Sequence, residues 1–225
     1  MLDDVSFAVR DGTVLALLGE NGAGKTTLLK LIAGLARPDA GSIALFGETD
    51  PRAVDALRRT RVAYSGGERG FYFRLTVRQN LDFFAALDGF RGRDRAERIV
   101  RACAAVDVTR ELDTRFAELS SGLRQRTAIA RALLGDADVL LLDEPTRTLD
   151  PLHAAAIRAF VRDVLVRERG KTVVLATNNL HEAVVLGDAA SVVRDGRLVP
   201  LDLSGDALER IAPERLFTPA AAPDA

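Results

Sequence analysis

The sequence predicts an α/β protein with a mainly parallel sheet and an inserted block of helices. Short apolar runs alternate with amphipathic segments, some runs are apolar on both faces, and the middle of the chain changes to helical periodicity. The chain has 225 residues, of which 48% are apolar, which is enough for one substantial domain. We expect a single domain with an α/β core at 1–76 and 134–200, a helical subdomain at 77–133 and a C-terminal extension at 201–225, disordered from Thr218.

The first half of the chain predicts a strand, a glycine-rich turn and a helix. Thr13–Leu18 is an apolar run of strand length, and glycines follow at positions 19, 22 and 24. Leucine and isoleucine then recur at helical spacing in Thr26–Leu35. Two further strands are predicted at Ser42–Phe46 and Arg61–Tyr64.

The second half predicts a helical block followed by a return to strands. Apolar residues recur at helical spacing from Val77 to about Leu134, with charged residues between them. Asp195–Gly196 is a typical hairpin turn. The other predicted elements are, in order, the strand Val139–Leu142, the helix Leu152–Arg167, the strand Thr172–Ala176 and the hairpin strands Ser191–Val193 and Arg197–Val199.

Charge and composition exclude several classes of function. The chain carries 31 basic and 32 acidic residues, so it lacks the overall positive charge of a nucleic-acid-binding protein. One cysteine, Cys103, cannot form an internal disulfide, which is compatible with a reducing cytoplasm. No apolar run approaches the roughly 18 residues that cross a membrane. We therefore expect no nucleic-acid partner and no membrane span of the chain's own.

The most specific motif is a glycine-rich loop between the first strand and the first helix. Glycines let backbone N–H groups face phosphate oxygens, and the N-terminus of the helix adds positive charge. Lys25 supplies a cation, and the Thr26 hydroxyl can bind Mg²⁺. A chance match by an ordinary glycine-rich turn is expected in about 1% of chains this long. The segment predicts a P-loop NTPase core that binds ATP through Gly19, Glu20, Asn21, Gly22, Ala23, Gly24, Lys25, Thr26 and Thr27.

A pair of carboxylates ends the strand Val139–Leu142. This strand is apolar on both faces, so it belongs in the middle of the sheet, and its carboxyl end lies where ligands bind in open α/β sheets. We expect Asp143 to hold Mg²⁺ through water and Glu144 to orient or deprotonate the attacking water. The alternative is that both residues only begin a loop.

Together with the residues between them, these motifs resemble the nucleotide-binding domain of ABC transporters, over nearly the whole chain. The segment Leu119–Arg126, LSSGLRQR, resembles the family signature LSGGQ-x-Q-R. In the family this segment covers the γ-phosphate of ATP held by a partner subunit, so Ser120, Ser121 and Gly122 are expected to contact ATP. The alternative is an ordinary serine-capped helix start. A second signature-like string, Ser65–Glu68, comes too early in the chain and is interpreted as a loop.

The resemblance also implies partners and a location. Glu144–Pro151 resembles the stretch after the catalytic glutamate of the family, and Asp150 matches the aspartate that contacts the other subunit. The family fold includes a small antiparallel β portion near the N-terminus. By resemblance, the chain pairs with a second nucleotide-binding subunit, identical or related, and with a transmembrane permease subunit. Its expected location is cytoplasmic, on the inner face of the cell membrane.

Two positions depart from the family pattern. The lid glutamine that follows the strand near Tyr64 is replaced by Gly67, with Glu68 beside it. The switch histidine is replaced by Asn178, whose amide can donate a hydrogen bond but cannot carry a proton. His181 lies three residues later, at a helical position that makes it a poor substitute. We therefore assign Glu144 and Asn178 as the catalytic residues and expect ATP binding with slow hydrolysis.

Three functions remain open at this stage. The resemblance favours ATP hydrolysis that drives an exporter of drug, lipid or polysaccharide type, because the signature and the stretch ERGFYFRLTVRQNL resemble such ATPases. The first alternative is a catalytically weak regulatory subunit of a heterodimeric transporter. The second is a soluble ABC ATPase that acts on DNA or ribosomes. For the aromatic run Phe71–Phe73, docking to the transmembrane partner and packing within the helical block are equally supported.

Overall fold

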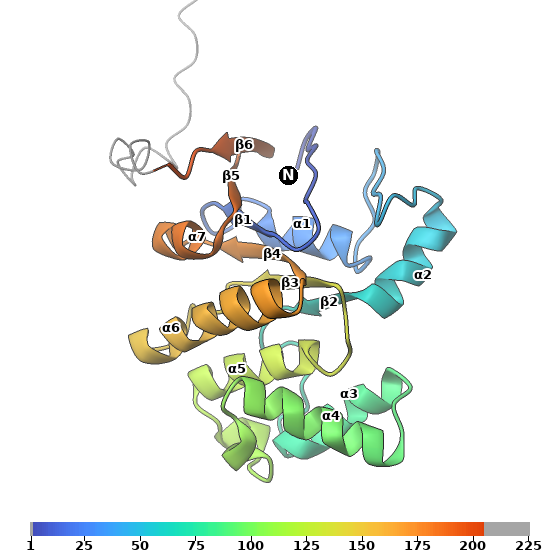
Figure 1. Cartoon of the computed structure of the whole chain (residues 1–225), viewed down its shortest axis with the longest axis vertical. Helices are drawn as coiled ribbons and strands as arrows, with labels where there is room; N and C mark the ends of the chain where they lie inside the picture. Colours follow the sequence, from blue (N-terminus) through green and yellow to red (C-terminus); the bar gives the residue numbers. More distant parts are fainter. Residues whose placement is uncertain (1, 205–225) are drawn as a thin grey trace, which may run out of the picture.

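The computed structural model describes residues 2–204, which form a six-stranded sheet with helices on both faces (Figure 1). The predicted disorder from Thr218 lies outside these residues. The strand order is β2-β3-β4-β1-β5-β6. The strands are β1 Val14–Leu18, β2 Val62–Ser65, β3 Val139–Asp143, β4 Thr172–Thr177, β5 Ala189–Arg194 and β6 Arg197–Leu201.

Parallel pairing dominates this sheet. β2, β3, β4, β1 and β5 run parallel to their neighbours, and only β6 pairs antiparallel, with β5. Every residue of β1 and β4 is buried, because these central strands are covered on both faces. The predicted α/β fold with a mainly parallel sheet is therefore confirmed, and the predicted hairpin corresponds to β5–β6.

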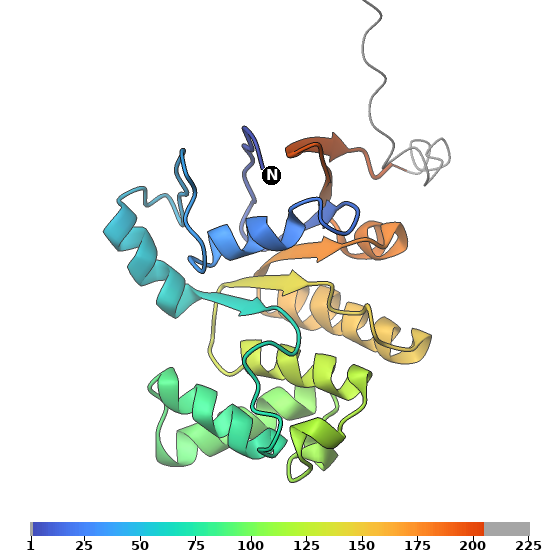
Figure 2. The same cartoon turned by 180° about the vertical axis from the view of Figure 1, so that it is seen from behind.

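Alternate residues of β1 face different layers of helices. Leu15 and Leu17 pack with α1, Lys25–Ile32, on one face. Ala16 and Leu18 pack on the other face with α7, Leu180–Leu186. That second face is also covered by α6, Pro151–Ala159, and its π-helical continuation Phe160–Glu168, as Figures 1 and 2 show from opposite sides. This sandwich fixes α1, and the loop before it, against the sheet.

The helical block lies beside the edge strand β2 and has an aromatic centre. Phe116 is fully buried and stacks on Phe71, with ring centroids 4.4 Å apart, while Phe84 meets Phe71 edge to face at 5.3 Å. Asn80 is completely buried and holds the preceding loop through the Tyr72 backbone. The block contains α3 Val77–Leu87, α4 Gly92–Ala105, short 3₁₀ turns at Thr109–Glu111 and Phe116–Glu118, and α5 Ser121–Ala132.

The strand expected at Ser42–Phe46 is wrong, and the expected small antiparallel portion is present as β5–β6, at another place in the chain. Ser42–Phe46 is not a strand; the segment contains only an isolated bridge between Leu45 and Glu48. Gly41 and Gly47 have positive φ angles of 89° and 81°, which favour turns over an extended strand. Antiparallel pairing near the N-terminus is limited to that bridge, and the antiparallel strand pair of the described chain is β5–β6.

A helix that the sequence analysis did not predict, α2, covers Pro51–Arg61. Its start carries the usual signals, because Asp50 accepts hydrogen bonds from the N–H groups of Arg52 and Ala53 at 3.0 Å, and Pro51 occupies the first turn. Its charged sequence buries only Val54, so the apolar periodicity is too weak to identify it. None of the helices within residues 2–204 is long and apolar enough to cross a membrane.

Truncating Phe116 to alanine is expected to destabilise the protein by about 3–5 kcal/mol, because it leaves a cavity against Phe71. Phe73→Ala is the control, since 44% of that side chain is exposed, and it should cost less than half as much. Urea denaturation followed by circular dichroism measures both values. Equal losses would contradict the placement of Phe116 at the centre of the block.

Candidate functional site

Three polar segments follow the carboxyl ends of neighbouring parallel strands. Leu18 at the end of β1 pairs with Thr177 at the end of β4, and Asp143 at the end of β3 pairs with Ala176. The strands therefore stop at the same edge of the sheet. The glycine-rich loop begins there, at Gly19 after β1. Glu144 and Asn178 lie at the same edge, as the first residues after β3 and β4.

The glycine-rich loop has the backbone that phosphate binding requires. Gly22 and Gly24 have φ angles of 87° and 109°, which L side chains rarely adopt. A Cβ atom on Gly19 would lie 2.9 Å from the Val193 carbonyl oxygen, so this position has no room for a side chain. No side chain caps the N-terminus of α1, which leaves its N–H groups directed at the loop. The loop can therefore accept an anion.

Lys25 lies under this loop and is 5% exposed. Its Nζ donates hydrogen bonds to the carbonyl oxygens of Gly19, at 2.7 Å, and Glu20, at 3.0 Å. Burial lowers the pKa of Lys25, while the negative charges of Glu144 and Asp143 oppose that shift. Its Nζ is 3.9 Å from the Glu144 carboxylate. The ammonium group thus connects the loop with the acidic pair.

Thr26 and Asp143, the predicted metal ligands, are in direct contact. The Thr26 hydroxyl donates to Asp143 Oδ2 at 2.8 Å, although the residues are 117 positions apart in the chain. A hydroxyl and a carboxylate are hard oxygen ligands of the type that Mg²⁺ prefers. The pair therefore fits a magnesium site beside the phosphate loop. The Tyr64 hydroxyl donates to the same carboxylate oxygen at 3.2 Å.

Glu144 has an unusual backbone conformation for a carboxylate residue. Its φ angle is 48°, in the left-handed region that costs non-glycine residues on the order of 1 kcal/mol or more. Its N–H donates to the Ala176 carbonyl at 2.8 Å, and its carbonyl accepts from Gln125 Nε2 at 3.2 Å. Arg147 Nη1 lies 3.1 Å from Glu144 Oε2, as an ion pair without hydrogen-bond geometry. These contacts hold the side chain at the sheet edge.

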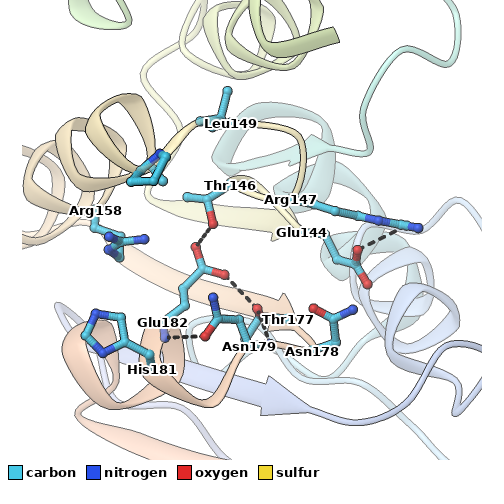
Figure 3. Close-up of a pocket in the computed structure, with 12 residues that line it drawn as sticks. Glu144, Thr146, Arg147, Leu149, Arg158, Thr177, Asn178, Asn179, His181 and Glu182 are labelled. Carbon is cyan, nitrogen blue, oxygen red and sulfur yellow. Dashed lines mark hydrogen bonds and ion pairs between the residues drawn. The ribbon is translucent and has the colours of Figure 1, made fainter.

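A pocket of about 520 Å³ opens beside Glu144. Figure 3 shows the side chains of Glu144 and Asn178 pointing into the same part of it, with Arg147 on the far side of the Glu144 carboxylate. Asn178 is exposed, so its amide is free to meet a ligand or a partner chain. His181 lies on α7 and lines a different part of the pocket, to the left of Asn179 and Glu182 in Figure 3.

The structure places Gly67 in a left-handed turn. Its φ angle is 72°, and a Cβ atom there would lie 3.7 Å from Gln125 Oε1. The neighbouring Glu68 is directed away toward α5, where its Oε2 is 3.4 Å from Arg124 Nη1. Glu68 is thus paired with α5 and not with the glycine-rich loop.

The segment Ser120–Gly122 is separated from the glycine-rich loop of its own chain. Ser120 caps α5 by accepting from the Leu123 N–H at 3.3 Å. Figures 1 and 2 show α5 and α1 on opposite sides of β3. The segment instead contacts the loop after Glu144, since Thr148 Oγ1 donates to the Ser121 carbonyl at 3.3 Å.

Asp150 caps the N-terminus of α6. Its Oδ1 accepts from the N–H groups of Leu152 and His153 at 3.1 Å, and its Oδ2 lies 2.5 Å from His153 Nδ1. The backbone hydrogen bond from His153, followed by the side-chain contact with His153, lowers the pKa of Asp150. The fully exposed neighbour Leu152, 78% accessible, projects from the same turn.

Sequence reasoning missed a buried carboxylate, Glu182, that connects two of the polar segments. Glu182 is 1% exposed, accepts from Thr146 Oγ1 at 2.7 Å and accepts from Thr177 Oγ1 at 2.6 Å. Thr146 belongs to the loop after Glu144, and Thr177 precedes Asn178. The family pattern around the switch histidine, T-H-D-L-x-E-A, is matched by residues 177–183 of this chain, and its glutamate corresponds to Glu182, which was the available signal. Gln125 matches the second glutamine of the pattern LSGGQ-x-Q-R, so a signal existed for it as well, whereas Tyr64 had none.

Comparison with known proteins identifies the relatives of this chain. The family model described as ABC transporter matches residues 2–147. The ABC transporter ATP-binding protein NatA of Bacillus subtilis is 36% identical over 197 residues, which cover 87% of this chain and 79% of NatA. The Nod factor export ATP-binding protein I of Burkholderia thailandensis is 40% identical over 200 residues, which cover 88% of this chain and 64% of that protein. Among solved structures, the dimeric post-hydrolysis state of the ATP-binding cassette MJ0796 bound to ADP and Pi superimposes with a TM-score of 0.82 at 26% identity, covering 91% of each chain.

Replacing Glu182 with alanine is expected to destabilise the protein by about 2–4 kcal/mol, because two buried hydroxyls lose their acceptor. Glu182→Gln keeps a side chain of the same size with one acceptor oxygen, and should cost less than half as much. Urea denaturation of the purified variants measures the difference. If the alanine variant were as stable as the glutamine variant, the two hydroxyls would not depend on this carboxylate.

Proposed function

The chain belongs to the ABC transporter family of ATP-binding proteins, and from this premise we propose that it binds and hydrolyses ATP as the subunit that powers a membrane transporter. The observation that carries the proposal is the meeting of Lys25, Thr26, Asp143 and Glu144 at one edge of the sheet. This cluster combines an anion-binding loop, a pair of metal ligands and a candidate base.

In the proposed site, the loop Gly19–Thr26 holds the phosphates of ATP through backbone N–H groups. Lys25 gives up its bonds to the Gly19 and Glu20 carbonyls and turns to the outer phosphates. Thr26 and Asp143 hold Mg²⁺, which when bound neutralises phosphate charge. Glu144 accepts a proton from, or orients, the water that attacks the γ-phosphate.

We propose that the active form contains two nucleotide-binding subunits. The separation of Ser120–Gly122 from the chain's own loop supports this, because the segment can then cover ATP on a partner. The related cassette MJ0796 is dimeric in its solved structure. Asp150 and the exposed Leu152 lie beyond the same loop and would face that partner.

The residues expected for ATP binding are all present, whereas two of the residues expected for fast hydrolysis are replaced. The groups proposed to hold ATP and Mg²⁺ are intact, whereas Gly67 and Asn178 replace the lid glutamine and the switch histidine. Glu68 does not stand in for the glutamine, because it pairs with Arg124. Loss of one preorganised contact to developing charge costs about 10²–10³ in rate. We therefore propose tight ATP binding with slow turnover.

Single-turnover hydrolysis by the purified protein tests this proposal. The wild-type rate should be slow, and Asn178→His should raise it by about 10²-fold, the contribution of a well-placed acid–base group. Glu144→Gln added to Asn178→His is the control and should remove the gain, which excludes a contaminating ATPase. A fast wild-type rate that Asn178→Ala leaves unchanged would contradict the proposal.

The same substitutions favour one second function, a regulatory subunit in a heterodimer with a fully active partner. In that case Asn178→His would not raise turnover of the isolated chain, and a related chain with an intact glutamine and histidine would supply the hydrolysis.

The proposed direction of transport and the proposed location of the protein rest on its relatives and expected partners. We propose export, because one relative is named as a Nod factor export protein, and a cytoplasmic position at the membrane, held by a permease subunit.

Two exposed aromatic residues form the proposed docking surface for the permease. Tyr72 is 49% exposed and Phe73 is 44% exposed, and Tyr72 contacts Phe83 edge to face at 5.1 Å. Exposed aromatic clusters of this kind are typical of protein interfaces. Phe71 does not belong to this surface, since it is 6% exposed and stacks on Phe116. The docking interpretation of Phe71 is therefore wrong.

The combined variant Tyr72→Ala and Phe73→Ala should weaken recruitment to membranes that contain the permease by about tenfold or more, as expected for the loss of interface anchors. The permease is to be sought as the membrane protein encoded by a neighbouring gene. Val199→Ala, at an exposed position on β6, is the control and should bind normally. Unchanged recruitment of the double variant in a co-sedimentation assay would contradict docking at this surface.

A further inference from the structure

The glycine pair Gly66–Gly67, inside the signature-like string Ser65–Glu68, has no role in the proposed function so far. Gly66 has a specific neighbour, because the side chain of Tyr64 lies directly over its backbone. A Cβ atom on Gly66 would be 2.5 Å from ring atoms Cε1 and Cζ of Tyr64 and would overlap the hydroxyl as well. The φ angle of Gly66 is not in the left-handed region, so the ring alone excludes a side chain here.

The Tyr64 ring reaches the proposed metal site from the neighbouring strand. Tyr64 on β2 pairs with Leu141 on β3, two residues before Asp143. Its ring packs against the core between the sheet and α1, and its hydroxyl donates to Asp143 Oδ2 at 3.2 Å. Thr26 Oγ1 donates to the same oxygen at 2.8 Å. Within residues 2–204, these two hydroxyls are the side-chain donors to Asp143.

The two hydroxyl donors have different proposed roles in Mg²⁺ binding. Thr26 is itself a proposed ligand, and its hydroxyl would offer a lone pair to Mg²⁺ in addition to the proton that it donates to Asp143. Tyr64 is not a ligand and can keep its bond. Hydrogen-bond donors outside the ligand set hold metal-binding carboxylates in orientation, and their loss typically costs 10–100-fold in metal affinity.

We propose that Tyr64 is a positioning residue for the metal-binding carboxylate Asp143, and that Gly66 is a glycine because the Tyr64 side chain must pass over it. The inference rests on the proposed function, since it concerns Mg²⁺ bound with ATP. It also explains Gly66 in the early Ser-Gly-Gly string without reference to the signature. The polar group beside the proposed metal site then comes from Tyr64 at the end of β2, three residues before Gly67, which has no side chain.

Titration of Mg²⁺ against binding of a fluorescent ATP analogue, trinitrophenyl-ATP, tests the inference on the whole purified chain. The midpoint of the Mg²⁺-dependent increase in affinity is the readout, with binding in EDTA as the reference. Tyr64→Phe keeps the ring and removes only the hydroxyl, so the midpoint should rise by about tenfold. Thermal unfolding of each variant checks that the protein is folded at the assay temperature.

The glycine supplies a second, independent variant. Gly66→Ala should displace the Tyr64 ring and raise the Mg²⁺ midpoint by a similar factor, but it should change the midpoint little in the Tyr64→Phe background, where no hydroxyl remains to be displaced. Gly135→Ala is the matched control, because a Cβ atom there meets no heavy atom within 4 Å and its φ angle is ordinary.

The outcomes separate this inference from the function on which it rests. An unchanged Mg²⁺ midpoint for Tyr64→Phe would overturn the role of Tyr64. Equal shifts by Gly66→Ala in both backgrounds would overturn the role of Gly66. Wild-type protein that fails to bind the ATP analogue, with or without Mg²⁺, would contradict the proposed function and this inference together.

Discussion

The parallel register of β3, β4 and β1 is the constraint on which the site depends. Because Leu18 pairs with Thr177 and Asp143 with Ala176, three chain segments leave the sheet at the same level. Side chains alternate between faces along a strand, so a slip of one residue in β3 would exchange the side chains that pack on the two faces of the sheet and turn Asp143 away from Thr26. The apolar packing of α1 against Leu15 and Leu17 makes such a slip costly. Core packing thereby sets the positions of the polar groups.

Polar groups at this edge are already satisfied by contacts that a ligand can replace. Lys25 is bonded to two loop carbonyls, Thr26 to Asp143, and the Glu144 carboxylate faces Arg147. Burial of the Lys25 ammonium would be costly without such partners. Under the proposed function, entry of a charged phosphate would exchange one set of contacts for another. The left-handed Glu144 is held in the same way, through hydrogen bonds from Gln125 and to Ala176.

The sequence could predict the parts of the fold that rest on local pattern, and it failed where contacts join distant segments. Apolar strands, the loop Gly19–Thr26 and the helical block each have a periodicity or a motif within a few residues. α2 was missed although Asp50–Pro51 is a start signal, because its body is charged and buries only Val54. The contacts of Glu182 with Thr146 and of Tyr64 with Asp143 could not be predicted, because these partners lie 36 and 79 positions apart and only the folded sheet brings them together.

Asn178 stands where the family pattern has a histidine, but the segment around it is still held by hydrogen bonds. The Asn179 N–H still donates to Thr177 Oγ1 at 3.0 Å, Asn179 caps α7, and Glu182 ties Thr177 to the loop that follows Glu144. A segment with no remaining role would not need a fully buried carboxylate to hold it, since an unpaired one is costly. The supporting bonds thus favour a segment that still meets ATP or the partner subunit through the exposed amide. Under the proposed function, the hydrogen bonds that hold the Asn178 segment beside the site are retained, while Asn178 has no group suited to proton transfer.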